Sequence, residues 1–299
     1  MAQTLDRIPG VGAPTQRSSG IEITNMMTRG SLRDLADFSR IFDKYARTYG
    51  AVRALDGLDS RWMLFNEMLP SSDKTGLHID AGCGDGYVLA ESRRKLPNFR
   101  RIGIDVSMRM LEGAKRGIDD LEGATHEQLT AKLIWASISQ GNLRFGRNAD
   151  EISANFVNMF MGQETQEGFW KNCGKWAAPG GRVRIQTLFS DTPNVTLRSI
   201  SMKLGQEQMA TNPKGVADFM NENNQEVYKE LGPRMHIPSE GWVAEQLERN
   251  GFEKPIDEAP WHLAGLGKVG GILVATKGNG NRPFISIPGS LGSPLPLAK

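Results

Sequence analysis

Apolar positions recur along the first part of this chain at the spacing of helices. From Ser31 to Gly50 they return every three or four residues, which predicts one face of a helix that begins at a Ser31–Asp34 capping box and ends at a glycine. The apolar positions are Leu35, Phe38, Phe42, Tyr45 and Tyr49. A second helix is expected from about Val52 to Met68, before Pro70. Folded structure is therefore expected to start at residue 31 with two N-terminal helices over residues 31–70.

Short apolar runs further along predict strands. Two of them end in an acid, at Asp80 and at Asp105. Further strands are expected near Lys132–Ser137 and over Ile152–Met161, with a helix at about Met108–Arg116. Residues 1–30 and 278–299 are instead rich in glycine, proline and serine, a composition that buries little and predicts disordered tails. Because no internal repeat or linker interrupts residues 31–277, they are expected to form a single domain.

A glycine-rich loop is the most informative motif. His78 to Gly86 reads HIDAGCGDG, in which Gly82, Gly84 and Gly86 follow a strand ending near Asp80, with Cys83 between the first two. Such a loop lets the backbone approach a ligand and directs a helix N-terminus at it. In the dinucleotide fingerprint two residues separate the second and third glycines, whereas here one does. Asp80 would repel a pyrophosphate but could help to hold a cationic amino group.

The second acid completes this motif. Asp105 closes the run RIGIDVS nineteen residues after Gly86, close to the spacing at which an acid accepts hydrogen bonds from two ribose hydroxyls. Val106 follows it directly. The two stretches together imply a nucleoside ligand with a cationic group.

These motifs resemble those of the class I S-adenosylmethionine-dependent methyltransferases. Trp176–Ile185, WAAPGGRVRI, resembles the family's PGG turn before strand five, while LERNGF at 247–252 and GILVATK at 271–277 resemble its closing helix and last strand. The resemblance implies an α/β, Rossmann-like fold with a mostly parallel sheet of seven strands flanked by helices. It also implies S-adenosylmethionine as cofactor, with a cofactor-binding set of Asp80, Gly82, Cys83, Gly84, Gly86, Asp105 and Val106.

Other cofactor contacts follow from the same resemblance. The segment FDKYARTY, Phe42–Tyr49, resembles the one ahead of motif I in ubiquinone and menaquinone C-methyltransferases, where it folds over the cofactor; Tyr45 and Tyr49 are thus candidate contacts, although helical spacing equally fits packing. The family's adenine-binding acid is replaced by Ser139, with Gln140 beside it, and either could bind adenine.

The residues of the predicted strand 152–161 limit which kinds of acceptor are expected. Asn155-Phe-Val-Asn158 has no prolines of the kind found in amino-methylating nucleic-acid enzymes, and it offers amides where a hard cation would need carboxylates, so no metal is expected. Asn155 is a candidate cofactor contact, whereas Asn158 is expected to make ordinary strand-end hydrogen bonds.

The acceptor is expected to be a small, partly apolar molecule that is methylated on O, N or C. Residues 190–240 carry several methionines and are expected to form a helical lid insertion over an adaptable cavity. If the nucleophile must lose a proton, His236 and His262 are the candidate bases. Three alternatives stay open: a nicotinamide oxidoreductase, a cofactor-binding relative with a non-methylating or binding role, and a protein or RNA methyltransferase.

Composition adds limits on partners. Lys and Arg total 36 against 34 Asp and Glu, so there is no electrostatic case for a nucleic-acid partner. The two cysteines, Cys83 and Cys173, fit a reducing compartment, and no apolar run is long enough to span a membrane. The sequence therefore favours a cytoplasmic enzyme, and a homodimer is compatible with it.

Overall fold

The computed structural model describes most of the expected domain. The described residues are 21–27, 29–46, 65, 67–123, 131–189, 191, 203, 206, 209, 213, 214, 217, 229, 230, 235–263 and 267–279. Most of the expected second helix and most of segment 190–240 lie outside them, as do Tyr49 and all of the tail beyond residue 279. No helix among the described residues is long and apolar enough to cross a membrane.

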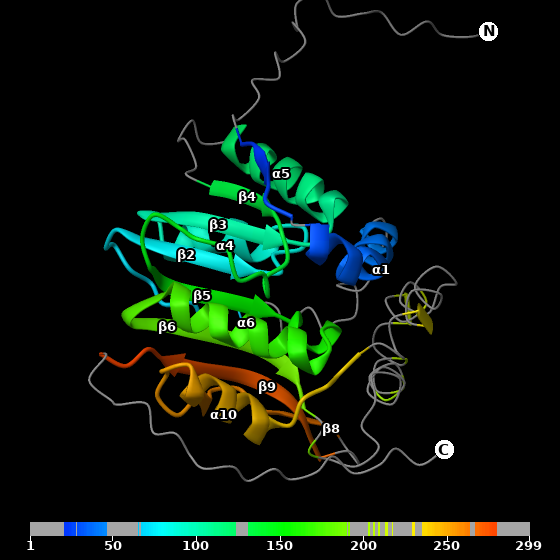
Figure 1. Cartoon of the computed structure of the whole chain (residues 1–299), viewed down its shortest axis with the longest axis vertical. Coiled ribbons are helices and arrows are strands. Elements are labelled where there is room, and N and C mark those ends of the chain that lie inside the picture. The colour runs from blue at the N-terminus through cyan, green and yellow to red at the C-terminus, as the bar shows by residue number, and fades with distance from the viewer. Residues whose placement is uncertain are drawn as a thin grey trace, which may run out of the picture.

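One nine-stranded sheet organises these residues (Figure 1). Its order is β1-β4-β3-β2-β5-β6-β9-β7, with β8 also paired to β9. The first six strands in this order run parallel: β1 Ile23–Asn25, β4 Ala131–Trp135, β3 Phe99–Asp105, β2 Gly76–Ala81, β5 Ala149–Asn155 and β6 Ala177–Leu188. Strand β9, Gly267–Thr276, pairs antiparallel with β6, and the short strands β7, Ile256–Asp257, and β8, Trp261–Leu263, each pair antiparallel with β9. The prediction of an α/β fold with a mostly parallel sheet is confirmed.

The strand order places a candidate site. The chain builds outward from β2 through β3 to β4, then returns to the other side of β2 with β5 and β6. The order thus reverses between β2 and β5, and ligands of open α/β sheets bind at the carboxyl ends of the strands at such a point. Helix α1, Arg29–Tyr45, lies beyond these ends (Figure 1).

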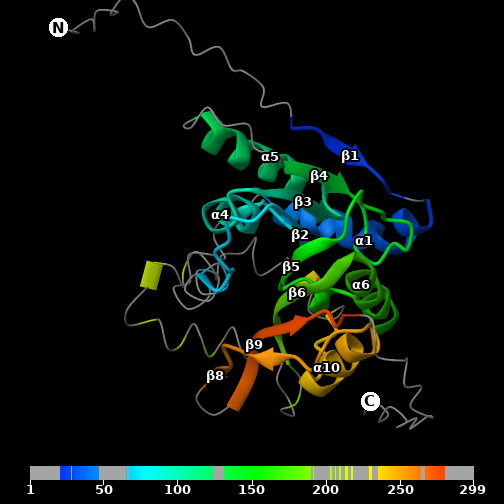
Figure 2. The same cartoon turned by 90° about the vertical axis from the view of Figure 1, so that its left-hand side faces the viewer.

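Helices cover both faces of the sheet, as Figures 1 and 2 show. On one face α6, Gln163–Trp176, and α10, Glu240–Arg249, pack on an apolar layer that includes Ile79, Ile152 and Ile185. On the other face lie α4, Tyr87–Lys95, and α5, Met108–Gly123; Leu89 of α4 and Leu111 of α5 pack with Leu133 of β4.

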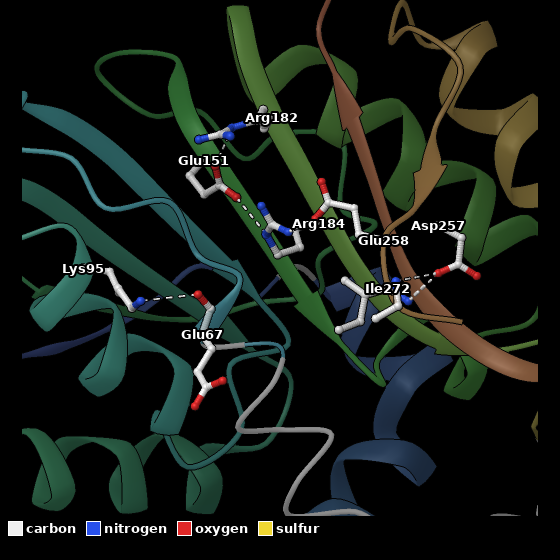
Figure 3. Close-up of polar contacts among 9 residues, drawn as sticks. Glu67, Lys95, Glu151, Arg182, Arg184, Asp257, Glu258 and Ile272 are labelled. Carbon is white, nitrogen blue, oxygen red and sulfur yellow. Dashed lines mark hydrogen bonds and ion pairs between the residues drawn. The ribbon is translucent and has the colours of Figure 1, made fainter. Parts of the chain in front are cut away.

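The face covered by α4 and α5 carries buried polar side chains in the middle of the sheet. Because alternate residues of a strand share a face, the register places His78 and Asp80 of β2 beside Glu151 and Ser153 of β5. Glu151 in turn points toward Arg182 and Arg184 of β6, at 3.4 and 3.5 Å (Figure 3). Central strands of a parallel sheet are usually apolar on both faces, so this row of polar side chains calls for a functional or electrostatic explanation.

Several predicted boundaries are wrong. Residues 1–30 are not a tail throughout, because Ile23–Asn25 form β1 along β4, and α1 starts at Arg29 rather than at Ser31. The strand expected over 152–161 ends at Asn155, since Phe156 takes the left-handed conformation (φ 54°), which cannot continue a strand; a 3₁₀ turn, η1, follows at Asn158–Phe160. Seven strands were expected, whereas the described sheet has nine, of which β1, β7 and β8 have three residues or fewer.

Candidate active site

The loop between β2 and α4 wraps tightly over the end of β3. The backbone N–H groups of Gly82 and Cys83 both donate to the Ile104 carbonyl, at 2.8 and 3.0 Å. Gly82, Gly84 and Gly86 all have positive φ, at 73°, 53° and 80°. A Cβ on Gly82 would lie 2.2 Å from Val157 Cγ2, so this turn excludes larger residues for two reasons, backbone conformation and space. Gly86 then caps α4, whose N-terminus opens at the loop.

Asp105, at the end of β3, is hydrogen-bonded to the backbone of the loop. Its Oδ2 accepts from the Gly84 N–H at 2.9 Å and its Oδ1 from the Ser107 N–H at 2.8 Å. Burial raises the pKa of Asp105 to about 6, against the lowering effect of these backbone hydrogen bonds. Each carboxylate oxygen can accept more than one hydrogen bond, so acceptor capacity is left for ligand hydroxyls. Val106, half-buried, follows it and accepts at its carbonyl from Trp135 Nε1.

Asp80 lies on the neighbouring strand with a different set of partners. It is 1% exposed, and its Oδ1 accepts from Ser153 Oγ at 2.7 Å, whereas its buried Oδ2 has no hydrogen-bond partner among the described residues. Burial raises the pKa of Asp80 to about 7; the Ser153 hydrogen bond lowers it, and the negative charges of Asp105 and Asp85 raise it. A buried unpaired carboxylate oxygen is costly, and a ligand cation would relieve that cost.

Helix α1 contacts the start of α5, next to Asp105. Asp43 Oδ1 accepts from Ser107 Oγ at 2.6 Å and from the Arg109 N–H at 3.2 Å, which ties α1 to the start of α5. Phe42 stacks edge-on against Phe160 of η1 at 5.1 Å between ring centroids. Tyr45, a candidate cofactor contact, is buried and packs in the cluster of Ile41 and Met110. Its ring therefore belongs to the contact between α1 and α5.

The two candidate adenine contacts differ in their surroundings. Ser139 is half-buried, and its Oγ shares a hydrogen bond with Ser137 Oγ at 2.8 Å. Gln140 is buried, and its Nε2 donates to the Met26 carbonyl at 2.7 Å and to Asn142 Oδ1. Gln140 thus joins the segment after β1 to the loop after β4, a role that the sequence did not indicate.

The carboxyl ends of β5 and β6 carry buried amides that no group in the described part of the chain hydrogen-bonds. Asn155 and Gln186 are register partners on the same face as Asp80, and Asn158 follows in η1. Asn155 Oδ1 and both polar side-chain atoms of Asn158 and of Gln186 are buried without a hydrogen-bond partner. The expectation of ordinary strand-end hydrogen bonds for Asn158 is wrong for its side chain. Gln186 was missed, because nothing in its local sequence marks a polar residue in an apolar strand as functional.

The two candidate bases occupy different places. His236 has an exposed side chain, but its backbone N–H donates to the Met159 carbonyl at 2.8 Å, which holds the residue beside η1. His262 is exposed on β8, which pairs with β9 on the far side of β6 from β2. Among the described residues, no three His, Cys, Asp or Glu side chains are grouped so as to hold a metal ion.

Part of the sequence matches a known protein family, and the fold is similar to solved structures. Residues 79–183 match the family model described as a methyltransferase domain. The fold is similar to that of phosphoethanolamine N-methyltransferase 2 of Haemonchus contortus in complex with S-adenosylmethionine (TM-score 0.56, 13% identity, covering 83% of this chain and 60% of that one). It is also similar to an O-methyltransferase family protein from Burkholderia thailandensis (TM-score 0.55, 15% identity, 79% and 60% covered).

A third similar structure is the magnesium protoporphyrin IX methyltransferase of Synechocystis with bound S-adenosylhomocysteine (TM-score 0.50, 17% identity, 84% and 100% covered). No curated protein sequence matches this chain. The chain spans 60% of the length of the Burkholderia and Haemonchus proteins. Residues 79–183, which include the glycine loop, thus match a methyltransferase domain, and two of the similar structures hold S-adenosylmethionine or S-adenosylhomocysteine.

Proposed function

We propose that this protein is a methyltransferase that moves the methyl group of S-adenosylmethionine to an O, N or C nucleophile of a small, partly apolar molecule. The observation that carries the proposal is the placement of two buried acids at the ends of adjacent strands: Asp80 in β2 directly before the glycine loop, and Asp105 in β3, which accepts from the Gly84 N–H of that loop. Asp105 offers acceptors for the ribose hydroxyls, and the free Oδ2 of Asp80 offers one for the ammonium group. Gly82 and Gly84 both have positive φ, a backbone conformation that lets the loop approach a ligand closely.

Methyl transfer from a sulfonium depends more on the alignment of the two reactants than on catalytic side chains. When bound, S-adenosylmethionine supplies an activated methyl group on a sulfonium, and in-line attack leaves the neutral thioether S-adenosylhomocysteine. The residues of this chain would orient the two reactants and exclude water from between them. A nucleophile that carries a proton passes it to solvent or to a base, for which His236 and His262 stay the proposed candidates.

The surroundings of the acceptor support a neutral, partly apolar substrate. The unpartnered amides of Asn155, Asn158 and Gln186 can donate and accept hydrogen bonds without adding charge. Next to them Phe156 and Trp261 pack ring against ring at 5.4 Å, within an apolar cluster that includes Met159 and Leu188. A neutral hydroxyl or carbonyl on an apolar body would satisfy the amides without burying an unpaired ion.

The proposed subgroup of methyltransferases and the proposed compartment rest mainly on the sequence. The Phe42–Tyr49 segment supports the ubiquinone and menaquinone C-methyltransferases as the nearest subgroup, and the contact of α1 with Ser107, two residues after Asp105, is compatible with it. Cys83 and Cys173 are both free, buried thiols, which supports a reducing compartment such as the cytoplasm.

Two measurements test the proposed function. Calorimetry should show binding of S-adenosylmethionine and S-adenosylhomocysteine and none of NAD. Incubation with methyl-labelled S-adenosylmethionine and a cell extract separated by size should then place the label in the low-mass fraction, with S-adenosylhomocysteine formed in equal amount. Absence of cofactor binding would contradict the function, and label confined to protein or RNA would contradict the substrate class.

A further inference from the structure

Three buried side chains of β2 and β5 form a continuous hydrogen-bonded line beneath the cofactor loop. His78 Nε2 lies 2.7 Å from Ser153 Oγ, and Ser153 Oγ lies 2.7 Å from Asp80 Oδ1. His78 and Ser153 are 0% exposed and Asp80 is 1% exposed. The parallel register explains the line, because Asp80 pairs with Ser153 and His78 with Glu151, so all three side chains share one face.

The direction of donation along this line follows from chemistry. Ser153 has a single hydroxyl hydrogen, and it points to Asp80. The hydrogen between Ser153 and His78 must therefore come from His78, whose Nε2 carries it, while its buried Nδ1 is left without a partner. Burial, with the charge of Arg101, lowers the pKa of His78 to about 3, so the ring is neutral. The line thus runs from His78 N–H through Ser153 O–H to the carboxylate.

Among the described residues, the Ser153 hydrogen bond is the one interaction that favours the ionised form of Asp80. The charged groups that act on it are Asp105 from β3 and Asp85 from the loop, and both are acids that oppose ionisation. Cys83 of the loop is a buried thiol whose pKa lies well above its usual value, so it is neutral. Within the described part of the chain, Ser153 alone donates to the Asp80 side chain.

We infer that His78 and Ser153 are positioning residues for the cofactor, which hold the Asp80 carboxylate ionised and oriented so that Oδ2 receives the ammonium group of S-adenosylmethionine. The inference rests on the proposed function, since it needs a ligand with a cationic group at Asp80. A hydroxyl polarised by a second donor is a stronger donor to a carboxylate than an isolated one. Because Oδ1 is occupied, Oδ2 is the oxygen that remains for the ligand.

The test compares two ligands by calorimetry between pH 6 and pH 9. S-adenosylhomocysteine carries the ammonium group, whereas 5′-methylthioadenosine has the same nucleoside and sulfur without the amino acid portion. In Ser153→Ala the affinity for S-adenosylhomocysteine at pH 7 should fall about tenfold, the loss expected for one hydrogen bond to a charged group. The affinity for 5′-methylthioadenosine should not change.

The pH profile separates positioning from a merely structural role. Binding of the cation needs ionised Asp80, so affinity for S-adenosylhomocysteine falls as pH falls through the Asp80 pKa. Without the Ser153 donor that pKa rises, so the loss should set in at a pH higher by about one unit. Ser92→Ala is the matched control, because Ser92 is also fully buried and hydrogen-bonded but lies on α4 away from Asp80.

A second pair of variants serves if Ser153→Ala does not fold. His78→Gln keeps an N–H donor near the Nε2 position and should retain the affinity for S-adenosylhomocysteine, whereas His78→Leu should lose it as Ser153→Ala does. Equal weakening of both ligands, or an unchanged pH profile, overturns the inference while the proposed function stands. If the unaltered protein binds neither ligand, the proposed function itself fails.

Discussion

At the scale of single residues, Asp105 shows how a carboxylate is oriented before any ligand arrives. Its two oxygens accept the N–H groups of Gly84 and Ser107, so it fixes both the glycine loop and the turn into α5. Backbone donors cannot be lost to rotamer changes, which keeps the carboxylate rigid. The same rigidity makes it a suitable acceptor for two neighbouring hydroxyls.

Replacement of Asp105 should weaken every nucleoside ligand. In Asp105→Ala the loss of charge-assisted hydrogen bonds, roughly 1.5 to 3 kcal/mol each, should reduce the affinities for S-adenosylhomocysteine and 5′-methylthioadenosine alike, as measured by calorimetry. This differs from Ser153→Ala, which should affect only the first ligand. Asp73→Ala, at an exposed position before β2, serves as control. An unchanged affinity in a folded Asp105→Ala protein would remove Asp105 from the site.

At the scale of elements, β5 and β6 are joined by a buried ion pair as well as by their backbone ladder. Glu151 and Arg184 are each 2% exposed, and Arg184 also contacts Glu258 at 2.9 Å (Figure 3). Burial raises the pKa of Glu151 to about 7, more than the two arginines lower it. The contribution of Glu151 to the free energy of unfolding therefore falls as pH rises from the ordinary pKa of a glutamate to about 7, because burial penalises the ionised form.

Removal of Arg184 should make the cost of burying ionised Glu151 measurable. In Arg184→Met the free energy of unfolding at pH 8 should fall by about 3 kcal/mol, since ionised, buried Glu151 loses its buried counter-charge and keeps only the more exposed Arg182. At pH 5 the loss should be smaller, because Glu151 can then take up a proton. The double variant Arg184→Met with Glu151→Gln should recover most of the stability in urea unfolding at pH 8. A loss of equal size at both pH values would show that packing, not charge, is what Arg184 contributes.

At the scale of the whole molecule, the cover of the site comes from segments far apart in the sequence. Helix α1 contacts η1 through Phe42 and Phe160, and its Lys44 pairs with Glu230 at 3.1 Å. The backbone of His236 is bonded to Met159 of η1. Parts of residues 31–50 and of 190–240 therefore meet at the carboxyl edge of the sheet, which is where water must be excluded for methyl transfer.

Both covering segments should respond together to ligands. Amide hydrogen exchange should slow in residues 31–50 and in residues 190–240 when S-adenosylhomocysteine and an acceptor are bound, because closure buries their backbone. Peptides from residues 247–253, which lie near the amino end of β6 beside Lys277, provide the control. Protection gained by only one segment would show that the other belongs to the permanent packing of the domain.

The sequence by itself determined the features that depend on neighbouring residues. The glycine loop of 82–86 and the strand-ending acids Asp80 and Asp105 follow from local backbone requirements, which a contiguous motif displays. Strands and helices in the family's order were enough to predict the α/β fold, which the structure confirms. The boundary at Asn155 was missed because the left-handed turn at Phe156 is held by tertiary contacts, including its ring contact with Trp261.

Only the tertiary structure decided which distant polar residues meet. Ser153 contacts Asp80 and His78 because β5 lies beside β2, and Glu151 meets Arg184 because β6 lies beside β5. Likewise β1 is a strand only because the edge of β4 is free to pair with it; three residues have no such tendency alone. Strand order and register fix these partners although they are far apart in the sequence, by 73 residues for Ser153 and Asp80. Local patterns carry no information about them, because side-chain hydrogen bonds and ion pairs depend on position in space rather than on position in the chain.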